Sequence, residues 1–152
     1  MKRKELKNQK GFTLIELVIV ITILAILAVT GISVYGNVTT KAKAQTDIES
    51  TSSIAGAIGR AMAEGKLSNT VAGGETLTSV STTGALLISG KYLTAIPPVK
   101  AMKTGARWLL VVDVPNGTVT ISAVGDTGAG AQTVQLYPRP TSFSVAPYDS
   151  LN

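Results

Sequence analysis

The feature that most constrains this chain is a long apolar run near its N-terminus, residues 12–34, with a single charged side chain, Glu16. A helix rises about 1.5 Å per residue, so about 23 residues span roughly 35 Å, more than the ~30 Å hydrocarbon core of a bilayer. The run therefore predicts one membrane-spanning helix. Most of the basic residues of the N-terminal part precede it, and no comparable cluster follows it directly. This asymmetry predicts a cytoplasmic N-terminus, with the rest of the chain outside.

Two plainer interpretations of the run are an ordinary secretory signal peptide and an uncleaved membrane anchor. A signal peptide has a shorter apolar core, about 7 to 15 residues, that ends in a small-x-small cleavage site. In this sequence Ala25 and Ala28 stand three positions apart, and a carboxylate lies inside the run. Both observations disfavour the signal peptide, although neither alternative is eliminated.

The carboxylate of Glu16 is the costly element of this run. An ionised glutamate within a bilayer costs about 2.5–3.5 kcal/mol on insertion scales, so by default it is functional and needs a partner. The nearest cations in sequence, Lys10 and Lys41, lie outside helical reach. A cut between Gly11 and Phe12 would supply a cation, the new α-amine of Phe12, on a second copy of the chain.

Residues 10–20, KGFTLIELVIV, resemble the type III leader and N-terminal helix of type IV pilins and of the pseudopilins of type II secretion. The resemblance implies that a membrane-embedded aspartyl prepilin peptidase cuts after Gly11 and that the amine of Phe12 is then methylated. It also implies that Glu16 meets the Phe12 amine of a neighbouring subunit during assembly. Gly11 lacks a Cβ atom, which suits a position where a protease needs extended backbone.

The sequence departs from the common pattern of this family in two places. Many such helices carry a proline where this one has Gly31-Ile32-Ser33, so Gly31 and Ser33 mark a possible weak point of the helix. Many Gram-negative pilins also close a C-terminal loop with two cysteines, and this chain has none. Without cysteine or histidine, thiolate metal sites and the usual nucleophile and general base are excluded, so we expect no catalytic residues, no metal and no cofactor. Lysine- or serine-based chemistry stays open.

The expected fold class is α+β, with a long N-terminal helix packed on a small antiparallel sheet. We divide the chain into a leader (1–11), a transmembrane and filament-core helix (12–35), an amphipathic helix (36–66) and a globular β head (67–152). The helix should end near Gly65, with one apolar face and a charged surface. The apolar positions are Val34, Val38, Ile48, Ala55, Ile58 and Met62, and the surface positions are Lys41, Lys43, Asp47, Glu49, Arg60 and Glu64.

The clearest strand signal is the alternating segment 107–114, which Pro115-Asn116-Gly117 joins to a returning strand at 118–124. We expect a third strand at 132–137 and a fourth at 142–146. Upstream, residues 68–83 should form a loop with at most one short strand at 77–80, and residues 84–93 a short helix.

The charge distribution disfavours nucleic acid as the main partner. The formal charge is +5, but four of these charges belong to the first ten residues, which leaves nine basic and eight acidic residues in the rest. The resemblance implies a subunit, foremost a major pilin, that forms a helical homopolymer. Its partners would be the prepilin peptidase, an inner-membrane assembly platform with its ATPase, and the membrane before assembly.

The same resemblance places the precursor in the cytoplasmic membrane and the assembled filament at the cell surface. It also allows a pseudopilin of type II secretion or DNA uptake, or a minor pilin whose head binds a surface or DNA. Lys91, Lys100, Lys103 and Arg107 are the basic residues available for the DNA-binding alternative. A membrane-anchored enzyme is a third class, disfavoured by the missing residue types.

Overall fold

The long N-terminal helix that the sequence predicts is α1, Leu14–Ala63, in a computed structural model that describes residues 11–68, 70–103, 105–126 and 130–152. The helix ends in a Schellman motif, in which Gly65 has a φ of 67°. Lys66 N donates to Ala61 O at 2.9 Å, and Gly65 N donates to Met62 O at 2.9 Å. The predicted stop at Gly65 is therefore confirmed. Residues 1–10 of the predicted leader lie outside the described residues.

The chain divides into two compact units between Val38 and Thr39, which we call the N-terminal and the C-terminal unit. The described part of the N-terminal unit is the first half of α1 with the three residues before it, and its large apolar side chains are exposed. α1 is long and apolar enough to cross a membrane, and none of its most apolar stretch is buried.

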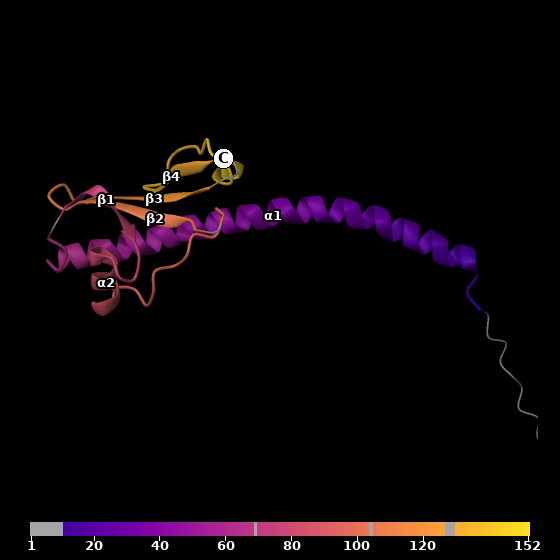
Figure 1. Cartoon of the computed structure of the whole chain (residues 1–152), viewed down its shortest axis with the longest axis horizontal. Coiled ribbons are helices and arrows are strands. Elements are labelled where there is room, and N and C mark those ends of the chain that lie inside the picture. The colour runs from indigo at the N-terminus through magenta and orange to yellow at the C-terminus, as the bar shows by residue number, and fades with distance from the viewer. Residues whose placement is uncertain (1–10, 69, 104, 127–129) are drawn as a thin grey trace, which may run out of the picture. The chain divides into compact units, whose positions relative to one another are not determined.

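The C-terminal unit contains one antiparallel sheet of four strands in sequential order, β1 to β4 (Figure 1). They are β1 (Val71–Leu77), β2 (Arg107–Asp113), β3 (Thr118–Asp126) and β4 (Ala131–Tyr137). In the central hairpin Trp108 pairs with Ala123, Leu110 with Ile121 and Val112 with Val119. Gly117, with a φ of 66°, supplies the turn. The predicted hairpin and the third strand are confirmed.

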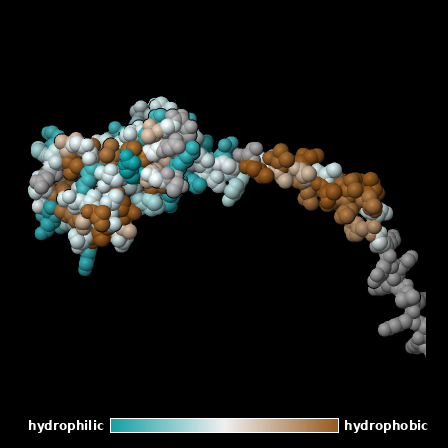
Figure 2. Space-filling model, viewed as in Figure 1, coloured by the Kyte–Doolittle hydropathy of each residue, from teal (hydrophilic) through white to brown (hydrophobic). Residues whose placement is uncertain are grey.

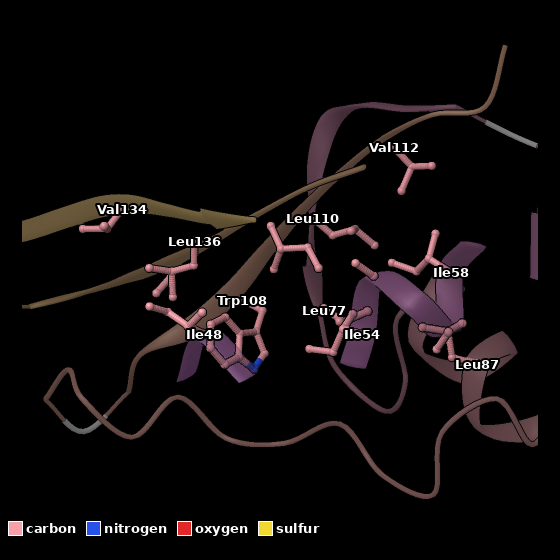
Figure 3. Packing of buried hydrophobic residues seen from close by; sticks show 14 of the residues in the cluster. Ile48, Ile54, Ile58, Leu77, Leu87, Trp108, Leu110, Val112, Val134 and Leu136 are labelled. Carbon is pink, nitrogen blue, oxygen red and sulfur yellow. The ribbon is translucent and has the colours of Figure 1, made fainter. Parts of the chain in front are cut away.

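The core lies between the second half of α1 and one face of the sheet. Ile48, Ile54 and Ile58 of α1 are buried against side chains of β2 and β4 such as Leu110 and Leu136 (Figure 3). Together with the buried Ala44, Thr51 and Ala61, these positions recur every three or four residues, as expected for a helix with one buried face. Of the predicted apolar positions, Val34 and Val38 lie outside this face and are exposed, at 64% and 59%.

Three predicted elements differ from the structure. A short strand was expected at 77–80, whereas β1 occupies 71–77. Its pairing with β2 contains a register shift between Val71 and Glu75, where Gly74 has a φ of 79°. The predicted short helix is α2, Thr82–Ser89, which starts earlier because the Ser81 side chain caps it by accepting a hydrogen bond from Gly84 N at 3.2 Å.

The fourth predicted strand, at 142–146, is wrong. This segment forms no strand, and a short 3-10 helix, η1 (Tyr148–Leu151), follows it. Asn152 holds it instead, since Phe143 N donates to Asn152 Oδ1 at 2.6 Å and Asn152 Nδ2 donates to Phe143 O at 2.7 Å. The nearby Pro140 and Pro147 have no N–H group for a ladder.

The predicted surface position of Asp47 is also wrong, because its side chain is fully buried. Its carboxylate accepts three hydrogen bonds, from Lys100 N at 2.8 Å, Ala101 N at 2.9 Å and the Tyr148 hydroxyl at 2.7 Å. These donors belong to the loop before β2 and to η1, so one side chain of α1 fixes two irregular segments. A buried carboxylate with three donors is compensated for much of its lost hydration.

Removal of the Asp47 carboxylate should destabilise the C-terminal unit. In Asp47→Ala the buried Tyr148 hydroxyl and two partly buried backbone amides lose their acceptor, which should lower the free energy of unfolding by about 3 kcal/mol. Glu49→Ala, at an exposed position two residues further along the helix, should change it by less than about 0.5 kcal/mol. Denaturant unfolding of the full chain in mild detergent, followed by Trp108 fluorescence, measures both, and equal midpoints for the two variants would contradict the assigned role.

Stability should also fall at alkaline pH through Tyr148. Burial raises the pKa of its hydroxyl, and the hydrogen bond to Asp47 adds to this effect. Because the folded pKa lies above the unfolded value near 10, this stabilisation is complete below about pH 10 and is lost as the pH rises above it. The free energy of unfolding should therefore fall more steeply above pH 10 in the wild type than in Tyr148→Phe. Tyr137→Phe is the control and should follow the wild type; parallel curves for all three would refute this prediction.

Candidate functional site

The candidate site is the start of the N-terminal unit, where three residues precede α1. Gly11, Phe12 and Thr13 have no regular secondary structure, and all three are exposed, Phe12 at 88%. Nothing lies within 4 Å of the position that a Cβ atom on Gly11 would take. The peptide bond between Gly11 and Phe12 is therefore in non-helical, accessible backbone, which is what a peptidase requires.

Thr13 and Glu16 form a reciprocal cap at the start of α1. Glu16 Oε2 accepts hydrogen bonds from Thr13 N and from the Thr13 hydroxyl, each at 2.8 Å. In return Glu16 N donates to Thr13 Oγ1 at 3.4 Å. This arrangement is a capping box, which satisfies amide groups that the first helical turn leaves without partners. The negative charge also lies at the positive end of the helix dipole.

In the single chain, Glu16 thus has local partners. A search for cations alone does not predict this cap, whereas Thr-x-x-Glu before an apolar run is its signal in the sequence. Among the residues that the structure describes, no cation pairs with the Glu16 carboxylate. Its expected role, to meet the Phe12 amine of a neighbouring subunit, stays a prediction.

The large apolar side chains in the rest of the N-terminal unit are exposed, and Figure 2 shows them as a largely brown surface on the face in view. Its threonines satisfy their own hydroxyls within the helix: Thr22 Oγ1 donates to Val18 O and Ile19 O at 2.8 Å, and Thr30 Oγ1 donates to Leu27 O at 3.0 Å. Such internal bonding suits a helix in lipid, where no water is available to polar groups.

The helix passes through Gly31 and Ser33 without interruption. Nothing lies within 4 Å of a Cβ atom placed on Gly31. Glycine still lowers helix stability by about 1 kcal/mol relative to alanine. The prediction of a weak point of the helix at Gly31 and Ser33 stays a prediction.

Of the basic residues considered for DNA binding, Lys91 lies apart from Lys100. The loop that carries Lys100 is held to Asp47, whereas Lys91 follows the end of α2, where the neighbouring Tyr92 hydroxyl donates to Glu64. Seventeen residues of helix separate Asp47 from Glu64, about 25 Å. Among the described residues, no group of three or more acidic side chains is placed to hold a metal ion.

Comparison with known families gives one match. Residues 6–32 match a family model described as the prokaryotic N-terminal methylation motif. Neither the curated proteins nor the solved structures contain a match. The matched segment includes Gly11, Phe12, the capping box of Thr13 and Glu16, and most of the exposed apolar helix. This motif, followed by an apolar helix and an antiparallel sheet in a pilin-like α+β layout, supports a prepilin of the type IV pilin or pseudopilin type.

Proposed function

We propose that the chain is a structural subunit of a type IV pilus, foremost its major pilin. The observation that supports this most is the N-terminal half of α1, which carries the methylation motif and buries none of its large apolar side chains. Such a surface requires lipid or other copies of itself. A precursor held in the cytoplasmic membrane would be surrounded by lipid. After its transfer to a filament, the same surface would be covered by other copies of the chain.

Processing would begin at Gly11. A prepilin peptidase cuts the bond between Gly11 and Phe12, removes the basic leader, and leaves a new amine that is methylated. The accessible, non-helical backbone at this bond supports that step. The leader carries Lys2, Arg3, Lys4, Lys7 and Lys10, which would hold the N-terminus on the cytoplasmic side until the cut.

Assembly would then depend on an exchange of partners at Glu16. In the precursor its carboxylate accepts from Thr13 N and Thr13 Oγ1. In the filament it would also face the methylated amine of Phe12 on a neighbouring subunit, a charge partner that none of the residues described in the single chain supplies. In an apolar environment this pair is worth more than in water, so it would select the helix register. The assembly platform and its ATPase would supply the work of extraction from the membrane.

The processing step predicts the outcome of a bulky substitution at the cut site. Gly11→Val should block cleavage, because a β-branched side chain stiffens the backbone that the peptidase must bind. Mass spectrometry of the membrane fraction should then find a chain that retains residues 1–11. Gly36→Val, within α1 and away from the cut, is the control and should be processed. Normal cleavage of Gly11→Val would argue against this site.

The assembly step predicts that incorporation depends on the charge of Glu16 even where its cap is kept. Glu16→Gln keeps an acceptor for Thr13 N, and so keeps the cap, but it loses the charge. Both Glu16→Gln and Glu16→Ala should insert in the membrane and be cleaved, yet at least tenfold less of either should appear in sheared surface filaments. Wild-type filament yield from Glu16→Gln would show that the charge is unnecessary and would refute the mechanism.

A further inference from the structure

A group of lysines that are far apart in sequence gathers at one end of the C-terminal unit. Lys41 and Lys43 lie on α1, and Lys100 and Lys103 lie on the loop before β2; all four are exposed. The two backbone bonds from Lys100 N and Ala101 N to the Asp47 carboxylate hold that loop beside α1, one turn beyond Lys43. We call Lys41, Lys43, Lys100 and Lys103 the basic cluster.

The charges around the basic cluster are predominantly positive. Within the C-terminal unit, the exposed carboxylate of α1 is Glu49, whose Oε1 accepts from Gln45 Nε2 at 3.5 Å, and that of the neighbouring η1 is Asp149. Asp47 is buried and occupied by its three donors. Within the part of the chain that the structure describes, the ammonium groups of Lys41, Lys43 and Lys100 form no ion pair. Such a surface attracts anions.

The position of the cluster along the chain indicates which anion. The exposed apolar run of α1 continues to Val38, and Tyr35, 72% exposed, is an aromatic side chain of the type found at membrane interfaces. Lys41 follows Val38 by three residues, about 4.5 Å of helix. A lysine side chain reaches phosphate groups at this depth while its aliphatic stem stays in the interface.

We infer that the basic cluster binds the headgroups of anionic phospholipids on the outer face of the membrane while the chain waits there as a precursor. This inference rests on the proposed function, since it needs a membrane-inserted chain. The backbone bonds to Asp47 give the cluster its width, because they add Lys100 and Lys103 to the two lysines of α1. The contact is broken when the subunit leaves the membrane.

The test measures the reactivity of each lysine in the full chain. The protein is reconstituted in vesicles of phosphatidylcholine, with and without phosphatidylglycerol, and is treated briefly with an amine-acetylating reagent. Mass spectrometry then compares acetylation of Lys41, Lys43 and Lys100 with that of Lys66 and Lys91, which lie toward the other end of the unit. Interaction with an anionic surface should slow acetylation of the cluster about fivefold per lysine, and 1 M salt should abolish the effect. Lys66 and Lys91 should react equally in all vesicles.

Paired variants keep the test independent of folding. Lys41→Gln/Lys43→Gln should weaken the lipid-dependent protection of Lys100, whereas Lys66→Gln/Lys91→Gln should leave it unchanged. Equal acetylation in both vesicle types would overturn the inference. Protection that is independent of lipid charge but rises with protein concentration would also overturn it, since it would assign the cluster to contacts between copies. Resistance to alkaline extraction is checked first, because a chain that fails to insert refutes the proposed function as well.

Discussion

The exposed apolar half of α1 is the constraint on which the whole account depends. From Phe12 to Val38 its large apolar side chains are 39–88% exposed, and water is an unfavourable environment for all of them. Neither the sheet nor α2 covers them, because the core of the C-terminal unit takes its helical contribution from the second half of α1. The chain must therefore meet lipid, other copies, or both. The methylation motif at residues 6–32 supports a membrane-anchored prepilin. Under the proposed function, lipid surrounds this surface first, and other copies of the chain surround it afterwards in a filament.

The C-terminal unit achieves its order without covalent cross-links. Asp47 joins α1 to the loop before β2 and to η1, and Asn152 ties the chain end to Phe143. Both devices fix segments near the C-terminus, the region that a disulfide fixes in many related subunits. Ionic and hydrogen-bonded contacts of this kind depend on pH and are locally reversible, unlike a disulfide. The same Asp47 contacts also determine where Lys100 is displayed, which couples the stability of the unit to its surface charge.

The elements that the sequence predicted correctly are those whose structure depends on residues close together in the chain. The alternation in 107–114, the turn at Gly117 and the helix stop at Gly65 were sufficient to predict the central hairpin and the end of α1. Segments whose structure depends on distant partners were not predictable in this way. Residues 142–146 have strand-like composition, but Asn152 satisfies Phe143 in place of a ladder. Asp47 was assigned to the surface by residue type, although its spacing from Ala44 and Thr51 places it in the buried stripe. At the candidate site, the motif of Gly11, Phe12 and Glu16 is visible in the sequence. The hydrogen bond from Thr13 to Glu16 does not follow from the charges, and only the Thr-x-x-Glu pattern indicates it.

The central claim is that the chain matures at Phe12 and becomes the body of a filament. Filaments sheared from the cell surface can be imaged by electron cryomicroscopy while the N-terminal peptide of their main component is identified by mass spectrometry. The account predicts long filaments built from this chain, with a methylated Phe12 as the first residue and Glu16 beside the amine of a neighbouring subunit. Surface filaments that lack this chain as their main component, or a chain that still begins at residue 1 within them, would contradict it.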